Sequence, residues 1–216
     1  MRNTKRQREK FKLKNIILDN IYHNLKAYVI VTIIFFIGII AGVIFINHID
    51  EGQKAEISEY INDFITSLKG EYEINRGELL KNSLLDNLKL VLGMWFIGST
   101  VIGLPIVLGI VLYRGFCIGY TISSAITVLG TQKGIIFSLT SILAQNIIII
   151  PVLLALAVSG MKLYQSIMKD KRRENIKIEI IRHTMISIIL FFILIVASFA
   201  EVYISTNLLM MCLSFF

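Results

Sequence analysis

The chain has 216 residues, of which 55% are hydrophobic and 17% are charged, with a formal net charge of +7. A soluble domain is usually about 45–50% apolar, and here the excess lies in long runs typical of membrane spans. This composition predicts an all-α integral membrane protein and excludes a separate soluble enzyme domain. A basic cytoplasmic segment, residues 1–26, precedes one multi-span domain, residues 27–216. We expect about five transmembrane helices, at residues 27–46, 90–112, 115–129, 135–158 and 184–205.

The first 26 residues carry eight Lys or Arg and two acidic residues. Apolar residues recur there at every fourth position, from Leu13 to Leu25, so the segment could be a basic helix on the inner membrane surface. The alternative is a solvated tail that only sets orientation. The apolar run that follows has no small-residue cleavage site, so we expect an uncleaved first span rather than a signal peptide. Within this span, Gly38 and Gly42 have the spacing that lets a second helix approach closely.

Residues 47–89 form the one substantial polar loop, which we expect to face outward. An amphipathic helix is predicted inside it, because apolar residues recur at helical spacing. A helix of about twelve residues is marginal alone in water, so its apolar face needs the membrane surface, the rest of this protein or another protein. A second helix is expected to begin near Arg76 and to run into the next span. The candidate partner-docking residues are Ile57, Tyr60, Ile61, Phe64, Ile65, Leu68, Asn82 and Asn87.

The stretch from residue 90 to residue 129 is rich in glycine. Pro105 predicts a helix kink that must pack against another helix. Arg114 is expected to mark the inner interface, as a topology anchor between the second and third spans. Residues 115–129 are short for a span and either cross the bilayer by thinning it or form a re-entrant segment. The candidate helix-packing residues of the chain are Gly38, Gly42, Gly93, Gly98, Gly103, Pro105, Gly109, Gly115, Gly119 and Ser123.

The last two spans carry polar residues. Gln145 and Asn146 lie near the middle of one span, and Glu201 lies near the end of the other. We interpret these three as the intramembrane polar residues. Gln145 and Asn146 either join helices by hydrogen bonds or line a polar path, whereas Glu201 either marks an ion path or extends its side chain to the interface. Between the two spans, residues 159–183 form a predicted cytoplasmic loop with seven bases and three acids. The apolar tail, residues 206–216, is expected to lie back on the outer surface.

Lys and Arg residues predict the orientation. The N-terminal segment, Arg114 and residues 159–183 hold sixteen of them, and the remaining polar segments hold six. Short loops rich in Lys and Arg stay in the cytoplasm. This asymmetry predicts a cytoplasmic N-terminus and an outside C-terminus, and it favours five crossings over four.

Catalytic and metal-binding patterns are missing from the sequence. Cys117 and Cys212 lie in apolar segments and read as small hydrophobic fillers. The three histidines are distributed over different segments, and no zinc-protease, phosphate-loop or nucleophile-elbow motif is present. We therefore expect no enzyme activity, no cofactor, no metal site and no nucleic-acid partner.

Several loose motifs, taken in order, make the chain resemble the stage II sporulation protein M family. The family pattern is an Asn-containing helix entering a span, a glycine-rich second span, a Gly-Phe-x-x-Gly turn and a Glu-x-Tyr signature at the end of the last span. Arg114 and Thr206 stand where the family often carries Asn and Pro, so neither residue takes a role from it. The matching positions here are Asn82 with Asn87, Gly93 to Gly109, Gly115 to Gly119, and Glu201 with Tyr203.

The resemblance implies a non-catalytic protein of the mother-cell membrane in endospore-forming bacteria. Such a protein would hold two outward-facing peptidoglycan-degrading enzymes, the stage II sporulation proteins D and P, during engulfment. The residues alone leave open a different class, a permease-like transport or gating subunit whose residues 159–183 engage a cytoplasmic ATPase. Contact with membrane lipid is expected in both cases, and a homo-oligomer is compatible with both.

Overall fold

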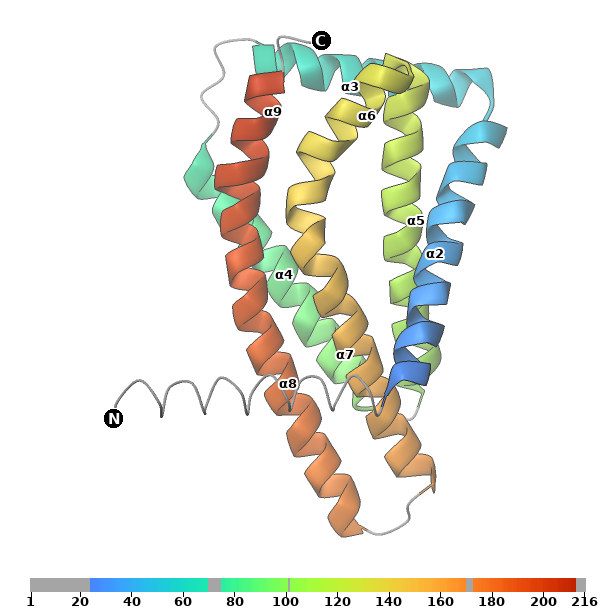
Figure 1. The fold of residues 1–216 in the computed structure, drawn as a ribbon, viewed down its shortest axis with the longest axis vertical. Coiled ribbons are helices and arrows are strands. Elements are labelled where there is room, and N and C mark those ends of the chain that lie inside the picture. Colours follow the sequence, from blue (N-terminus) through green and yellow to red (C-terminus); the bar gives the residue numbers. More distant parts are fainter. Residues whose placement is uncertain (1–23, 70–74, 101, 170–172, 213–216) are drawn as a thin grey trace.

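The computed structural model describes residues 24–69, 75–100, 102–169 and 173–212. Every regular element in these ranges is helical, which confirms the all-α prediction (Figure 1). Four stretches are long and apolar enough to cross a membrane: Leu25–His48, Gly103–Leu129, Gln145–Met168 and Ile176–Cys212. The helix Arg76–Gly98 also crosses the bundle obliquely in Figure 1, although it is not among these four.

The first span, α2 (Leu25–His48), packs against α5 (Gly103–Leu129) through glycines on both helices. A Cβ atom added to Gly38 or Gly42 would lie 2.2 or 2.3 Å from backbone oxygens of α5, at Leu112 and Phe116. Added to Gly115 or Gly119, it would lie 2.2 or 2.1 Å from backbone oxygens of α2. Since no side chain fits between them, the two backbones touch directly. The structure places these four predicted packing glycines in the direct contact between α2 and α5.

The predicted break between the second and third spans is wrong. One helix, α4 (Arg76–Gly98), ends before Ser99, and α5 then runs without interruption from Gly103 to Leu129. Gly103 is needed at the start of α5, because a Cβ there would lie 1.6 Å from the carbonyl oxygen of Ile97. The Gly-Phe-x-x-Gly segment, residues 115–119, is therefore in mid-helix and forms no turn.

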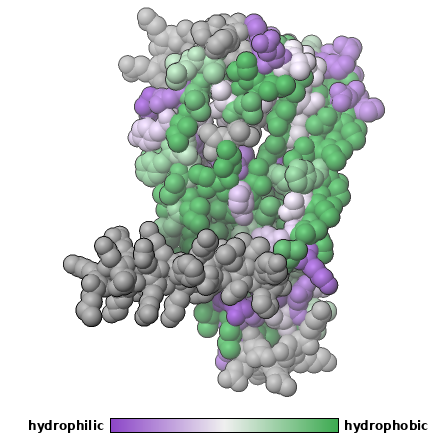
Figure 2. Space-filling view, viewed as in Figure 1, coloured by the Kyte–Doolittle hydropathy of each residue, from purple (hydrophilic) through white to green (hydrophobic). Residues whose placement is uncertain are grey.

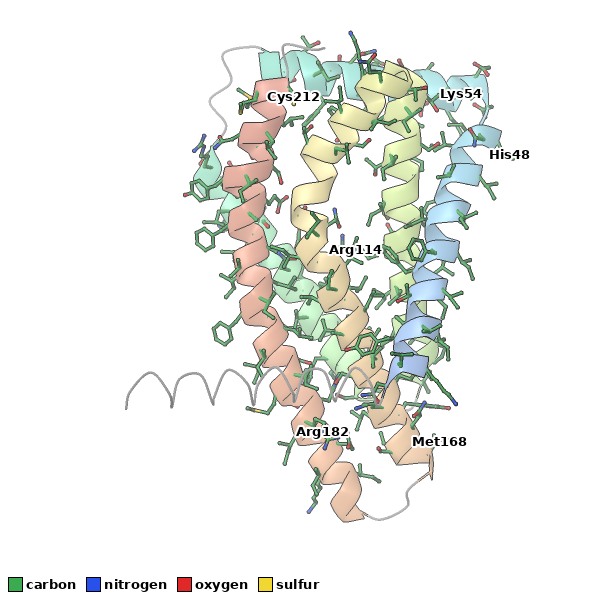
Figure 3. All side chains as sticks on the ribbon, viewed as in Figure 1. His48, Lys54, Arg114, Met168, Arg182 and Cys212 are labelled. Atoms are coloured by element: carbon green, nitrogen blue, oxygen red, sulfur yellow. The ribbon has the colours of Figure 1, made fainter. Side chains whose placement is uncertain are left out.

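Arg114 lies in the interior of α5 and not in a loop between two spans. Its neighbour Gly115 contacts α2 at Phe35, which is near the middle of that span. Figure 3 shows Arg114 at mid-height, well away from His48 and Lys54 at one end and from Met168 and Arg182 at the other. Its side chain is half-buried and makes no ion pair with a described residue. The expected role as a topology anchor is overturned.

Three further packing predictions fail for local reasons. Pro105 is the third residue of α5, where its missing N–H has no helical partner to lose, so no kink is required. Its side chain is exposed. Gly93 and Gly109 have nothing within 4 Å of an added Cβ atom. These residues do not lie in close helix contacts.

The next span is built from three helical pieces: α6 (Thr131–Ser138), η1 (Leu139–Leu143) and α7 (Ala144–Lys169). Gly130 separates them from α5 with a φ of 79°, a conformation that favours glycine. Gly134 then lets α6 fold back onto α5, because a Cβ there would lie 2.5 Å from the Cα of Ile126. The wider turns of η1, a π-helix, mark a local irregularity before α7.

The last span consists of α8 (Arg173–Ala200), η2 (Glu201–Ser205) and α9 (Thr206–Cys212). Two predictions are corrected here. The apolar tail continues the span as a helix as far as Cys212, and residues 213–216 lie outside the described residues. Most of the predicted cytoplasmic loop, residues 159–183, is helical and belongs to the ends of α7 and α8. The predicted helix within residues 1–23 also lies outside the described residues.

The bundle has two different ends. The remaining helix, α3 (Glu51–Lys69), lies across the end at which α2 finishes and α5 meets α6 (Figure 1). The ends of α7 and α8 project from the opposite end. Between them, hydrophobic residues cover much of the visible face, and hydrophilic residues gather toward the two ends (Figure 2). A face of this kind suits a bilayer, where exposed side chains must be apolar.

Candidate functional site

The centre of the polar structure is the carboxylate of Glu201, the first residue of η2. Its Oε2 atom accepts a hydrogen bond from the hydroxyl of Ser83 on α4 and another, of 2.5 Å, from the amide Nε2 of Gln145 on α7. Glu201 is half-buried, and no described residue forms an ion pair with it. One carboxylate thus joins three separate parts of the bundle.

Both π-helical segments adjoin this carboxylate. η1 ends two residues before Gln145, and η2 begins at Glu201 itself. A π-helical turn contains one more residue than an α-helical turn, so it changes which side chains face the interior, and such turns are frequent at functional sites. Here they accompany the meeting of Gln145 and Glu201. The intramembrane polar residue Asn146 is half-buried beside them.

A second polar contact lies below the carboxylate, between α4 and α8. The Nδ2 atom of Asn87 donates to the hydroxyl of Ser198 at 2.8 Å and to the carbonyl oxygen of Leu194 at 3.4 Å. Asn87 and Ser198 are both buried. An amide in the apolar interior must find such partners, since an unsatisfied polar group there is costly. Asn87, predicted as a partner-docking residue, is instead an internal contact between helices.

Two more contacts continue this polar line toward the opposite end of the bundle. The indole Nε1 of Trp95 donates to the hydroxyl of Thr184 at 3.0 Å. Further along, the ring Nδ1 of His183 lies 2.8 Å from the hydroxyl of Ser159. Gly98 permits this arrangement, because an added Cβ atom would lie 3.2 Å from Nε2 of His183. Gly98, a predicted packing residue, thus lies close to both α7 and α8.

Chemically, this line of residues is suited to helix association. Interhelical hydrogen bonds of this kind contribute roughly 0.6–2 kcal/mol each. Within the described ranges, no group of three or more His, Cys, Asp or Glu residues is placed to hold a metal ion. Three buried hydroxyls, those of Ser124, Ser138 and Ser205, have no hydrogen-bond partner among the described residues. They lie toward the α3 end of the bundle. Ser123, a predicted packing residue, is buried beside the first of them.

The second feature of interest is the outer helix α3. The side chain of Asp50 caps it by accepting from the backbone N–H of Gln53 at 2.8 Å. Ile61 and Ile65 are buried against Ala125, Phe137 and Leu209, and Ile57 packs on the same cluster. The predicted amphipathic helix therefore exists, and much of its apolar face covers the protein's own spans.

Two apolar residues of α3 remain accessible. Tyr60 is 74% exposed and Phe64 is 40% exposed, with the ring of Phe64 edge-on to Phe137 at 6.1 Å between centroids. They border a mainly apolar cavity of about 490 Å³ that opens between α3, α5 and η1. Leu68 lies in the last turn of α3, and Asn82 is exposed on α4. Of the predicted docking residues with described side chains, Tyr60, Phe64 and Asn82 are the ones still available to a partner.

Sequence reasoning missed several of these groups. The sequence does not single out Ser83 or Ser198, and it shows His183 only as one of three histidines in different segments. A signal existed, because Ser83 precedes Asn87 by one helical turn and Ser198 precedes Glu201 by three residues. Each helix thus presents a polar pair on one face. What the sequence does not show is that the two pairs meet.

Together, these contacts define an all-helical integral membrane protein whose interior polar groups join its helices. Comparison with protein families then gives a match to the stage II sporulation protein M family over residues 31–206. Because the match covers most of the chain, this protein belongs to that family, and it is a sporulation-related membrane protein. No curated protein and no solved structure matches the chain.

Proposed function

We propose that this protein is a non-catalytic scaffold of the engulfment complex, which holds peptidoglycan-degrading enzymes at the mother-cell membrane. The stage II sporulation proteins D and P are the proposed partners. Family membership supports the setting. The observation that carries the proposal is the α3 surface, where Tyr60 and Phe64 stay accessible on a helix that is otherwise anchored to the bundle.

The charge distribution supports placing this surface outside the cell. The ends of α7 and α8 include Lys162, Lys177 and Arg182, and they lie at the opposite end of the bundle from α3. Lys- and Arg-rich short segments remain cytoplasmic. The structure places Arg114 and Lys89 in helices and not in loops. Leaving both out of the count of loop Lys and Arg residues does not change which end has more of them. A cytoplasmic α7–α8 end directs α3 toward the cell wall, where the substrates of such hydrolases lie.

The test is co-purification of both hydrolases with the tagged protein from sporulating cells. Tyr60→Asp should lower their recovery severalfold, because a charge replaces a large apolar contact. Phe64→Asp should do the same, but it also removes the Phe137 contact and so tests folding as well. Asn62→Asp is the matched control, since Asn62 is exposed on the same helix. Full recovery with Tyr60→Asp at equal expression would contradict the docking role of α3.

A second candidate function is a transport or gating subunit driven by a separate cytoplasmic ATPase. Glu201 favours it, because a half-buried carboxylate without an ion-pair partner among the described residues is typical of ion paths. The projecting ends of α7 and α8 would provide the ATPase contact. Photo-crosslinking from Lys177, which is exposed on α8, should then capture an ATP-binding protein. Capture of no such protein would remove this candidate.

A further inference from the structure

The outward face of α4 carries charges at a depth where a lipid-facing helix should have none. Asp86 and Lys89 form an ion pair of 3.0 Å, and their side chains are 69% and 75% exposed. No described residue from another helix accompanies them in an ion pair. Their position along the bundle follows from the contacts that α4 makes on its other face.

α4 runs antiparallel to α8, and its hydrogen bonds fix the alignment of the two helices. Arg76 contacts Asn207, Ser83 contacts Glu201, Asn87 contacts Ser198, and Trp95 contacts Thr184. Asp86 and Lys89 lie between Ser83 and Trp95, so they are level with residues 184–200 of the last span. That stretch has seventeen residues and no charge. The ion pair therefore lies at the depth of the hydrocarbon core.

Charges exposed to lipid at this depth are unfavourable. Insertion scales assign a large cost to Lys or Asp at the centre of a lipid-exposed helix, and such residues normally face protein or water. Mutual pairing reduces this cost but leaves both groups exposed. We therefore expect another protein surface to shield this face of α4 from lipid.

The residues on this face have the spacing of a helix-pairing seam. We define the α4 seam as five exposed residues, in which the intervals alternate between three and four. Such a pattern repeats every 3.5 residues, the period at which two helices pack along their whole length as a coiled coil. Single Asn or Lys residues within a seam of this type select register and partner number. The α4 seam consists of Asn82, Leu85, Lys89, Leu92 and Phe96.

The charges beside the seam identify the partner. Lys81 precedes the seam residue Asn82, and Asp86 follows Leu85. When two such helices pair in parallel, the position occupied by Lys81 on one helix faces the position occupied by Asp86 on the other, five places further on. Opposite charges at these two positions favour the pairing. Lys81 and Asp86 are five places apart and have opposite charge. A second copy of the same helix therefore supplies Asp86 to Lys81 and Lys81 to Asp86.

We propose that two copies of this protein pair through the α4 seam, in an isologous contact between parallel α4 helices. Copies inserted in the same direction present parallel α4 helices, so both Lys81–Asp86 contacts form at once, as an isologous interface requires. Lys89 and Asp86 then lie within the interface and no longer face lipid. This inference goes beyond the scaffold function and does not depend on it.

Disulfide crosslinking in membranes of a non-sporulating host tests the seam. The full chain carries Cys117→Ser and Cys212→Ser, to which Leu85→Cys or Leu92→Cys is added. Both should give a disulfide-linked dimer on oxidation. Ile33→Cys is the control, because Ile33 on α2 is 52% exposed, against 42% and 52% for the two leucines. No dimer from either seam position would overturn the proposal, as would equal crosslinking of Ile33→Cys.

A charge exchange tests the choice of partner. Two differently tagged copies that both carry Lys81→Asp place like charges together in both contacts, and two copies with Asp86→Lys do the same. One copy of each variant restores two attractive contacts. Co-purification of the mixed pair should exceed that of either matched pair by about tenfold, since two contacts change sign. Equal recovery of all three pairs would overturn the proposal, and so would a crosslink from the seam to a different protein alone.

Discussion

The two halves of this bundle are held together in different ways. Between α2 and α5, glycines bring backbone against backbone at four positions, and the ring of Phe45 packs on Phe116 beside them. Between α4, α7 and α8, hydrogen bonds from side chains, centred on Glu201 and Asn87, add to apolar packing. In lipid, where apolar burial drives helix association only weakly, both are effective solutions. The comparison shows that close backbone packing at glycines distinguishes the α2–α5 contact, and that hydrogen bonds between side chains distinguish the contacts among α4, α7 and α8.

The largest effect is expected from filling the glycine contact. Gly119→Leu places a side chain where the α2 backbone already lies, with the Cβ atom alone 2.1 Å from the carbonyl oxygen of Ile39. Overpacking typically costs about 1–3 kcal/mol, and we expect at least the upper value because backbone must move. The measurement is the thermal unfolding midpoint in detergent. Gly109→Leu is the control, since its site is open. Equal losses for the two would show that α2 and α5 are not held by close approach.

The next effect should come from removing the carboxylate. Glu201→Leu leaves the amide of Gln145 and the hydroxyl of Ser83 without their acceptor in the interior, which should cost about 2 kcal/mol. Glu201→Gln keeps one acceptor oxygen, so a smaller loss is expected. Both are measured by thermal unfolding. If Glu201→Leu were as stable as the unaltered protein, the carboxylate would not join the helices.

A smaller effect belongs to the contact between Asn87 and Ser198. A double-mutant cycle with Asn87→Leu and Ser198→Ala should give a coupling energy of about 0.6–1 kcal/mol, the usual range for hydrogen bonds between membrane helices. The cycle is measured by reversible unfolding in mixed micelles. Strict additivity of the two changes would mean that this hydrogen bond contributes nothing.

The smallest effect is expected at Trp95. Trp95→Phe removes the hydrogen bond to Thr184 but keeps an aromatic ring in a partly buried place. We expect a loss of roughly 0.5 kcal/mol, and Thr184→Val should reproduce it. A much larger loss from Trp95→Phe alone would indicate that ring packing, and not the hydrogen bond, holds the lower half of α4.

The sequence predicted the steric half better than the polar half. The four-residue spacing of Gly38 and Gly42 predicts close approach of a second helix, and the same spacing of their partners Gly115 and Gly119 predicts it from the other side. No comparable spacing pattern predicts which polar residues will pair with each other. Glu201 and Gln145 could be recognised as intramembrane polar residues, but their meeting depends on where two π-helical turns fall, which no local pattern predicts.

The helix boundaries failed for a related reason. Arg114 was expected at an interface because charged residues usually lie there, and Pro105 was expected to kink a helix. In fact the break lies at Ser99, and Pro105 belongs to the first turn of the next helix, a place that proline tolerates. Because the run is apolar throughout, a break near Arg114 and a break at Ser99 fit the hydrophobic pattern equally well. The packing of α5 on α2 decides between them.

The interior position of Arg114 also bears on biosynthesis. An arginine near the centre of a span lowers the tendency of that segment to enter the bilayer unaided, by about 2.5–3.5 kcal/mol. α2 carries its one Lys or Arg, Lys26, in its first turn and is otherwise apolar through the span, so it enters the bilayer readily. It leaves the ribosome before α5, and it presents a glycine groove that α5 fits. We therefore expect α5 to be inserted as the second member of a pair. The glycines of α2 would then help α5 to insert during synthesis, in addition to holding α5 in the folded protein.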